Sequence, residues 1–213
     1  MNSRPVIFVL AGVNGAGKSS IGGHLLRHAG LDWYNPDRFA RELMAATGCE
    51  QTHANALAWQ EGMRRLDAAL AAGTSFAFET TLGGIHVPAR LHDATATHDV
   101  TMWFCGLDSV DRHLARVQAR VAAGGHDIPE AKIRERWTRA RANLIGLMPH
   151  LAWLRVFDNS TDAAPGTAVP DPLTVLEMEH GRLLWPTDAT DWRHTPDWAK
   201  PLLEAALATP VGP

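Results

Sequence analysis

The sequence predicts an α/β fold built on a parallel sheet of about five strands with helices on both faces. Two observations support this class: short apolar runs alternate with longer amphipathic segments, and a glycine-rich loop follows the first apolar run. A third is that polar residues stand directly after several of these apolar runs. Alternating strands and helices imply parallel strands with right-handed crossovers, so ligands are expected at the carboxyl ends of the strands.

The first strand is expected at residues 5–11, because this run is apolar on both faces and too short for a buried helix. The phosphate-loop pattern G-x-x-x-x-G-K-[ST] follows at once, before a helix that should start near Lys18. Its glycines let successive N–H groups line an anion-sized hollow, and the helix N-terminus adds a positive field. Lys18 is expected to reach the outer phosphates, and the Ser19 hydroxyl to bind Mg²⁺. The pattern predicts a P-loop NTPase whose ATP-binding residues are Gly12, Val13, Asn14, Gly15, Ala16, Gly17, Lys18, Ser19 and Ser20.

The rest of the chain continues the alternation of strands and helices. Apolar runs predict strands at 31–34, 75–78, 99–105 and 153–157. Amphipathic segments predict helices at 37–47 and 54–72, and two more within 109–144. A hairpin is expected at 173–179 and 182–185, turning at His180-Gly181, and a short helix at 196–208. Residues 1–160 should form the P-loop domain, with 161–213 appended to it as a sheet edge or a dimerisation element.

Polar residues at the predicted strand ends are candidates for chemistry. Asp37 either caps the helix that begins there or accepts the proton of an attacking hydroxyl. Glu79 follows a buried strand as a Walker B acid does, so it orients a Mg²⁺-bound water or a substrate hydroxyl; its other interpretation is a turn residue. Thr80 joins Glu79 as a candidate for binding the substrate. Asn159 follows the last parallel strand, either as a turn residue or facing the nucleotide base.

The arginine segment, residues 109–144, carries eight basic and four acidic residues in a chain whose net charge is −3. Ser109 is a suitable N-cap for a helix in which Arg112, Arg116 and Arg120 share one face. Gly124-Gly125 separates this helix from a second one that starts near Pro129. Planar arginine forks suit phosphate oxygens, so the segment is interpreted as a lid over phosphates, against the alternative of a solvated surface.

Composition limits the classes of partner and the location. The negative net charge argues against general nucleic-acid binding. No apolar stretch reaches about 18 residues and no signal-peptide pattern precedes the loop, which predicts a cytoplasmic protein with no membrane partner. Cys49 and Cys105 lack the spacing of a metal or redox pair and are expected to be small core residues. The eight tryptophans are expected to pack the core.

Five separated motifs occur together in a fixed order. They are Gly12 to Ser19, Asn35-Pro36-Asp37, Glu79-Thr80-Thr81, the run from Arg116-Val117 to Ile128-Pro129-Glu130, and Asp158-Asn159-Ser160. In this order they resemble the zeta toxin family of P-loop kinases over about residues 5–160. The resemblance implies a nucleoside-kinase-like fold and an enzyme that phosphorylates a small molecule, as the family's toxins phosphorylate UDP-N-acetylglucosamine.

The resemblance also implies roles for single residues. Asp37 corresponds to the general base, Lys18 to the loop lysine, and lid arginines stabilise the transferring phosphoryl group. Arg116 and Arg120 match an Arg-Val-x-x-Arg-Val run, whereas Arg136 and Arg139 in the next helix are the other possibility. Arg136 is therefore also expected near the substrate. The resemblance further implies a separate antitoxin protein as a partner.

The phosphate loop predicts dependence on ATP and Mg²⁺, and the resemblance implies a kinase that acts on a hydroxyl of a sugar-bearing acceptor. Two other functions stay open at this stage. One is a polynucleotide- or RNA-directed kinase that uses the arginine segment. The other is a regulatory protein that binds ATP and transfers nothing.

Overall fold

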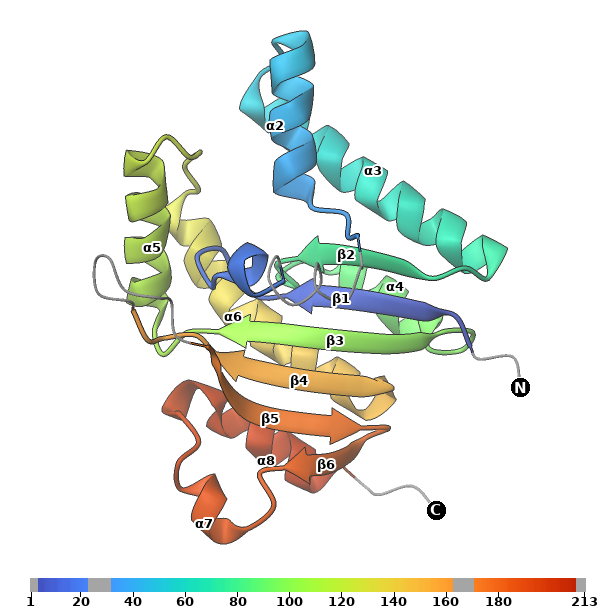
Figure 1. Cartoon of the computed structure of the whole chain (residues 1–213), viewed down its shortest axis with the longest axis vertical. Helices are drawn as coiled ribbons and strands as arrows, with labels where there is room; N and C mark the ends of the chain where they lie inside the picture. The colour runs from blue at the N-terminus through green and yellow to red at the C-terminus, as the bar shows by residue number, and fades with distance from the viewer. Residues whose placement is uncertain (1–3, 23–31, 163–170, 210–213) are drawn as a thin grey trace.

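The computed structural model describes residues 4–22, 32–162 and 171–209. Within these residues the chain forms a six-stranded sheet in the order β2-β1-β3-β4-β5-β6 (Figure 1). The strands are β1 (Val6–Ala11), β2 (Phe76–Thr80), β3 (Asp99–Gly106), β4 (Trp153–Asp158), β5 (Leu173–Glu179) and β6 (Arg182–Trp185). The α/β fold class predicted from the sequence is confirmed.

Four strands are parallel, and the hairpin adds two antiparallel ones. β1 lies between β2 and β3 in parallel register, and β4 continues the parallel order. β5 runs antiparallel to β4, and β6 antiparallel to β5. The tail is thus an edge extension of the sheet, one of the two roles expected for it, and both residues of its turn, His180 and Gly181, adopt positive φ. The strand predicted at 31–34 is reduced to a single parallel bridge from Tyr34 to Phe78, while residue 31 lies outside the described part.

The described helices fit the predicted alternation, with differences at their ends. They are α2 (Pro36–Thr47), α3 (Gln51–Ala72), α4 (His86–Ala94), α5 (Val110–Ala122), α6 (Glu130–Leu147), α7 (Ala189–Trp192) and α8 (Lys200–Ala208), with 3-10 turns at η1 (Met148–His150) and η2 (Asp197–Ala199). α3 begins three residues before its predicted start, α6 begins after Pro129, and α4 and α7 were not predicted. In the described part of the chain, no helix is both long and apolar enough to cross a membrane.

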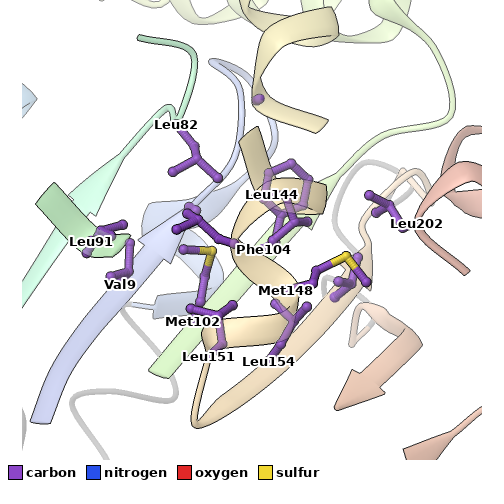
Figure 2. Close-up of a cluster of buried hydrophobic side chains, with 14 of the residues drawn as sticks. Val9, Leu82, Leu91, Met102, Phe104, Leu144, Met148, Leu151, Leu154 and Leu202 are labelled. Atoms are coloured by element: carbon purple, nitrogen blue, oxygen red, sulfur yellow. The ribbon is translucent and has the colours of Figure 1, made fainter. Parts of the chain in front are cut away.

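Alternation along the strands divides the core between the two faces of the sheet. Val9, Met102 and Leu154 point to the face covered by α4, α6 and α8, where they join the larger apolar cluster (Figure 2). Leu10 and Cys105 point to the opposite face, which the segment after the phosphate loop covers. Cys105 is therefore a buried core residue, as expected, and its thiol is free.

α2 and α3 form an arm that stands beyond the β2 edge of the sheet, while α5 flanks the phosphate loop at the ends of β1 and β3 (Figure 1). Asn35 caps α2 by accepting a hydrogen bond from the Arg38 N–H, and Gly48 closes the helix with a left-handed φ of 71°. The carboxyl ends of the parallel strands, the arm and α5 enclose one region of the molecule, where the predicted site residues gather.

Candidate active site

The phosphate loop, Gly12 to Ser19, is held by glycines that no other residue can replace. Gly12, Gly15 and Gly17 have φ values of 142°, 83° and 81°. A Cβ atom on Gly12 would lie 2.3 Å from the Cys105 carbonyl oxygen, and one on Gly15 would lie 2.8 Å from the His113 carbonyl oxygen. Both the conformation and the close packing therefore require glycine. The helix begins at Lys18, as predicted.

Two side chains from other elements donate hydrogen bonds to the backbone of the loop. Asn159 Nδ2, after β4, donates to the Ala16 carbonyl over 2.9 Å. His113 on α5 is 1% exposed, and its Nδ1 lies 2.8 Å from the Asn14 carbonyl. Since a carbonyl only accepts, Nδ1 carries the proton. Burial lowers the pKa of His113 to about 4, so the ring is neutral at pH 7.

At the start of the helix, Lys18, Ser19 and Glu79 form a compact polar cluster. The Lys18 ammonium lies 3.5 Å from Glu79 Oε1, and both residues are 7% exposed. Ser19 Oγ donates to Glu79 Oε2 over 3.2 Å. Two opposite charges at this depth balance each other, whereas either one alone would be costly to bury.

The same cluster fits Mg²⁺. No group of three or more His, Cys, Asp and Glu side chains able to hold a metal occurs in the described residues. Mg²⁺ does not need such a group, because it commonly takes one or two protein oxygens, several waters and the phosphates of its nucleotide. The Ser19 hydroxyl and the Glu79 carboxylate are oxygen donors of this kind, adjacent to the phosphate loop.

Asp37 lies in the first turn of α2 and does not cap it. The cap is Asn35, so the capping alternative for Asp37 is wrong. The Asp37 carboxylate is half-exposed and its Oδ2 lies 3.9 Å from Arg120 Nη1. With its capping task taken by another residue, this carboxylate is available for chemistry.

A cavity of about 330 Å³ brings most of the predicted residues together. Its polar side includes Asn14, Lys18, Asp37, Glu79, Thr80 and Arg136. Its apolar side includes Tyr34, Trp59, Phe78, Val87 and Ile128. The expectation that all tryptophans pack the core is wrong for Trp59, which is 48% exposed at this cavity. A second cavity of about 270 Å³ shares Trp59, Thr80 and Arg136 and adds Arg139.

The four candidate arginines differ in what holds them. Arg136 reaches the phosphate loop, where its Nη1 donates to Asn14 Oδ1 over 2.8 Å. Arg120 faces Asp37 and also donates to the His126 carbonyl over 3.4 Å. Arg116 pairs with Asp162 over 2.6 Å and does not line the cavity. Arg139 pairs with Glu135 on its own helix.

Acidic residues neutralise much of the arginine segment. Arg112 pairs with Asp108 and Asp162, and Arg134 pairs with Glu130 and Asp111. The positive charge counted along the sequence therefore does not form a free basic surface. The arginines that touch the loop or Asp37 are those of the inner faces of α5 and α6.

Sequence reasoning did not assign roles to His113, Trp59 or Lys132, or to Asn35 beyond its place in a motif. His113 lies on α5, a helix whose sequence is marked by its arginines, and Trp59 lies on α3, where polar and apolar residues are mixed. No local signal separates these residues from ordinary helical ones, because their partners come from distant parts of the chain. Ser20 is exposed at the third position of the helix, where its N–H donates to the Gly17 carbonyl over 3.0 Å.

The architecture and the loop define the fold as that of the P-loop kinases. A chain of the AvrRxo1-ORF1:ORF2 complex with ATP has a TM-score of 0.63 at 16% identity, over 92% of this chain and 65% of that one. A structure of the PezAT toxin–antitoxin system of Streptococcus pneumoniae has a TM-score of 0.50 at 13% identity, over 74% of this chain and 68% of that one. A chain of the Pnkp1/Rnl/Hen1 RNA repair complex has a TM-score of 0.51 at 20% identity, over 67% of this chain and 46% of that one.

The TM-scores show a shared fold despite the low sequence identities, and the zeta-toxin resemblance of the sequence is confirmed at that level. The chain spans about 65% of the length of the AvrRxo1-ORF1:ORF2 chain that it matches. No family model and no curated protein sequence matches this chain.

Proposed function

We propose that this protein is an ATP-dependent kinase that transfers the γ-phosphoryl group to a hydroxyl of a small, sugar-bearing acceptor. The observation that carries the proposal is a cavity in which the phosphate loop, the buried Lys18–Glu79 pair and the half-exposed carboxylate of Asp37 meet. ATP would place its phosphates on the loop, and the acceptor would enter beside Asp37. The reaction is proposed to take place in the cytoplasm, which supplies ATP.

Each part of the cavity has a task in phosphoryl transfer. Asp37 accepts the proton of the attacking hydroxyl. Lys18 and Arg136 neutralise the charge that develops on the phosphoryl oxygens, with Arg120 beside Asp37 and Arg116 as a further candidate. Ser19 and Glu79 would hold Mg²⁺, which would neutralise negative charge on the phosphates.

The cavity also supports a class of acceptor. Tyr34, Trp59 and Phe78 offer a flat apolar wall, while Lys132 and Arg136 offer positive charge. This combination suits an acceptor that carries both a ring system and an anionic group. UDP-N-acetylglucosamine, which the family resemblance implies, combines both and is the first acceptor to test, within a panel of nucleotide sugars and free sugars incubated with labelled ATP.

Lys18→Ala tests the proposed binding of ATP at the phosphate loop. The variant removes the positive charge at the loop and leaves Glu79 buried beside no cation, so we expect ATP binding to fall below detection by calorimetry. Lys200→Ala is the matched control, because Lys200 is an exposed lysine that pairs with Asp197 and does not line the cavity. ATP binding by Lys18→Ala at the wild-type level would overturn the proposal.

Asp37→Asn separates a kinase from a regulatory protein that binds ATP without transfer. We expect ATP affinity within about twofold of wild type and a loss of transfer of about 10³-fold, since the base is lost. Asp111→Asn is the control, because Asp111 is also an acidic residue in the first turn of a helix and is exposed. A wild-type transfer rate in Asp37→Asn would exclude Asp37 as the base.

A toxin role with a separate antitoxin partner is a further part of the proposal. AvrRxo1-ORF1:ORF2 and PezAT are complexes, and this chain shares their fold. Expression of the wild type in bacterial cells should slow growth, and expression of Asp37→Asn should not. Equal growth with both variants would remove the toxin role and leave the kinase intact.

An RNA-directed kinase is the second candidate, because the Pnkp1/Rnl/Hen1 RNA repair complex shares the fold. The ion pairs of the arginine segment argue against it, since they leave little free positive charge for a phosphate backbone. Salt-dependent binding of single-stranded RNA by the purified protein, with phosphorylation of its ends, would favour this candidate over the first.

A further inference from the structure

Asn35 lies between the phosphate loop and the arm because of how the chain pairs with β2. The Tyr34 N–H donates to the Ala77 carbonyl over 2.8 Å, and the Glu79 N–H donates to the Tyr34 carbonyl over 2.9 Å. This short parallel pairing aligns Tyr34 with Phe78. The next residue on each side is then Asn35 and Glu79, so the backbone itself sets their side chains next to each other.

The Asn35 amide uses both of its ends. Its Oδ1 accepts the Arg38 N–H over 2.9 Å, which caps α2. Its Nδ2 donates to Glu79 Oε2 over 2.7 Å and lies 3.4 Å from Ser19 Oγ. Aspartate would also cap the helix but has no N–H or O–H to donate when ionised, and serine or threonine would have to cap and donate from a single oxygen, whereas asparagine accepts and donates through two separate atoms. The structure thus uses the feature that distinguishes asparagine from the other good caps.

The Glu79 carboxylate has a different neighbour on each oxygen. Oε1 faces the Lys18 ammonium at 3.5 Å, and Oε2 receives Ser19 and Asn35. The contact with Asn35 is the shortest of the three. Without it, the carboxylate would be free to turn both oxygens towards Lys18, away from the Ser19 hydroxyl.

We propose that Asn35 is a positioning residue: its amide holds the Glu79 carboxylate towards Ser19 and fixes the start of α2, the helix that carries Asp37. This inference rests on the proposed function. It assigns to one side chain the link between the proposed metal-binding oxygens and the proposed base two residues further along. The alternative is that Asn35 serves only as a helix cap.

Asn35→Ser distinguishes the two roles. Serine keeps the cap, but its side chain is shorter and has no second polar atom in the place of the amide nitrogen that donates to Glu79. ATP binding is measured by titration calorimetry with Mg²⁺ and with EDTA. We expect affinity in EDTA within twofold of wild type, while the gain in affinity on adding Mg²⁺ falls about tenfold. Asp188→Ser, which changes the cap of α7, is the control and should leave both values unchanged.

A double-mutant cycle tests whether Asn35 acts through Glu79. In a Glu79→Gln background, adding Asn35→Ser should change the Mg²⁺ gain by less than twofold, because the carboxylate to be oriented is already gone. If Asn35→Ser does not unfold cooperatively, Asn35→Thr replaces it with the same expectations, since threonine also caps.

The outcomes separate this inference from the proposed function. A wild-type protein that binds no ATP would overturn both. A wild type with Mg²⁺-dependent binding, together with an Asn35→Ser variant whose Mg²⁺ gain is unchanged, would overturn the positioning role alone. Equal weakening with Mg²⁺ and with EDTA would show a cap and nothing more, and would also overturn it.

Discussion

The phosphate loop and the arginine segment both looked like phosphate-binding regions in the sequence, but they are built in opposite ways. In the loop, backbone geometry leaves no freedom: Gly12 and Gly15 have no room for a Cβ atom, and His113 and Asn159 hold the loop carbonyls. In the arginine segment, long and flexible side chains on two helices can reach several partners, and several of them form ion pairs with carboxylates. A rigid backbone site can be recognised from a local pattern, whereas a site made by flexible side chains depends on what the rest of the fold places nearby.

The largest effect should come from breaking the rigid region at its tightest point. Gly12→Ala would set a Cβ atom 2.3 Å from the Cys105 carbonyl oxygen at a φ of 142°, so we expect a loss of unfolding free energy of about 3 to 5 kcal/mol. Gly124→Ala is the matched control: its φ is 89°, but nothing lies within 4 Å of the added Cβ. It should cost about 1 kcal/mol. Urea unfolding measures both, and equal losses would show that packing against Cys105 is unimportant.

Next in size is the difference among the arginines. Arg136 contacts the loop through Asn14, so Arg136→Ala should lower the rate of phosphoryl transfer by about 10²-fold. Arg139→Ala, one turn away on the same helix and paired with Glu135, should change it by less than about twofold. Single-turnover kinetics with saturating ATP gives the comparison. Equal losses would mean that the helix acts by its overall charge.

A smaller effect concerns pH and the support of the loop. His113 has a pKa of about 4 in the folded protein, and an unfolded histidine titrates near 6.5, so the unfolded chain takes up a proton first. Stability should therefore decline as the pH falls from about 6.5 to 4, and this histidine should contribute about 2 kcal/mol to the decline between pH 7 and 4.5.

His113→Gln, whose amide can still donate to Asn14, should remove that share of the pH dependence. His53→Gln, at an exposed position, should leave it unchanged. Urea unfolding at a series of pH values measures the difference. If the free energy of unfolding has the same pH dependence in wild type and His113→Gln, protonation of His113 does not destabilise the folded protein.

The smallest effect should come from the outer ion pairs. Asp162→Ala removes the ion pair of Arg116, while Arg112 keeps its pair with Asp108. Because Asp162 is largely exposed, the free energy of unfolding should change by less than about 1 kcal/mol. If Arg116 acts on phosphates once released, ATP affinity should rise in this variant and not in Asp162→Ala combined with Arg116→Ala. No change in affinity would confine Arg116 to its surface pair.

Features set by a local sequence pattern could be predicted from the sequence, whereas contacts between distant residues could not. Apart from the strand expected at 31–34, the strands were predictable, as were the loop and the cap at Ser109, because alternation, glycine spacing and capping are local. Asn35 was not predicted as the cap of α2, since Asp37 is an equally good capping residue by type and only the backbone angles decide between them. The pairing of Arg116 with Asp162 was also beyond reach, because the two residues are 46 positions apart in the sequence.

The order of the sheet has a consequence for the limits of the folding unit. The tail after residue 170 reads as an appendage, yet β5 pairs along β4, and Trp198 lies against β3 so closely that a Cβ atom on Gly106 would come within 2.1 Å of its ring. Leu202 joins the central apolar cluster (Figure 2). A recombinant fragment that stops at the last parallel strand would expose that cluster to water, so expression of residues 1–158 alone should give insoluble protein.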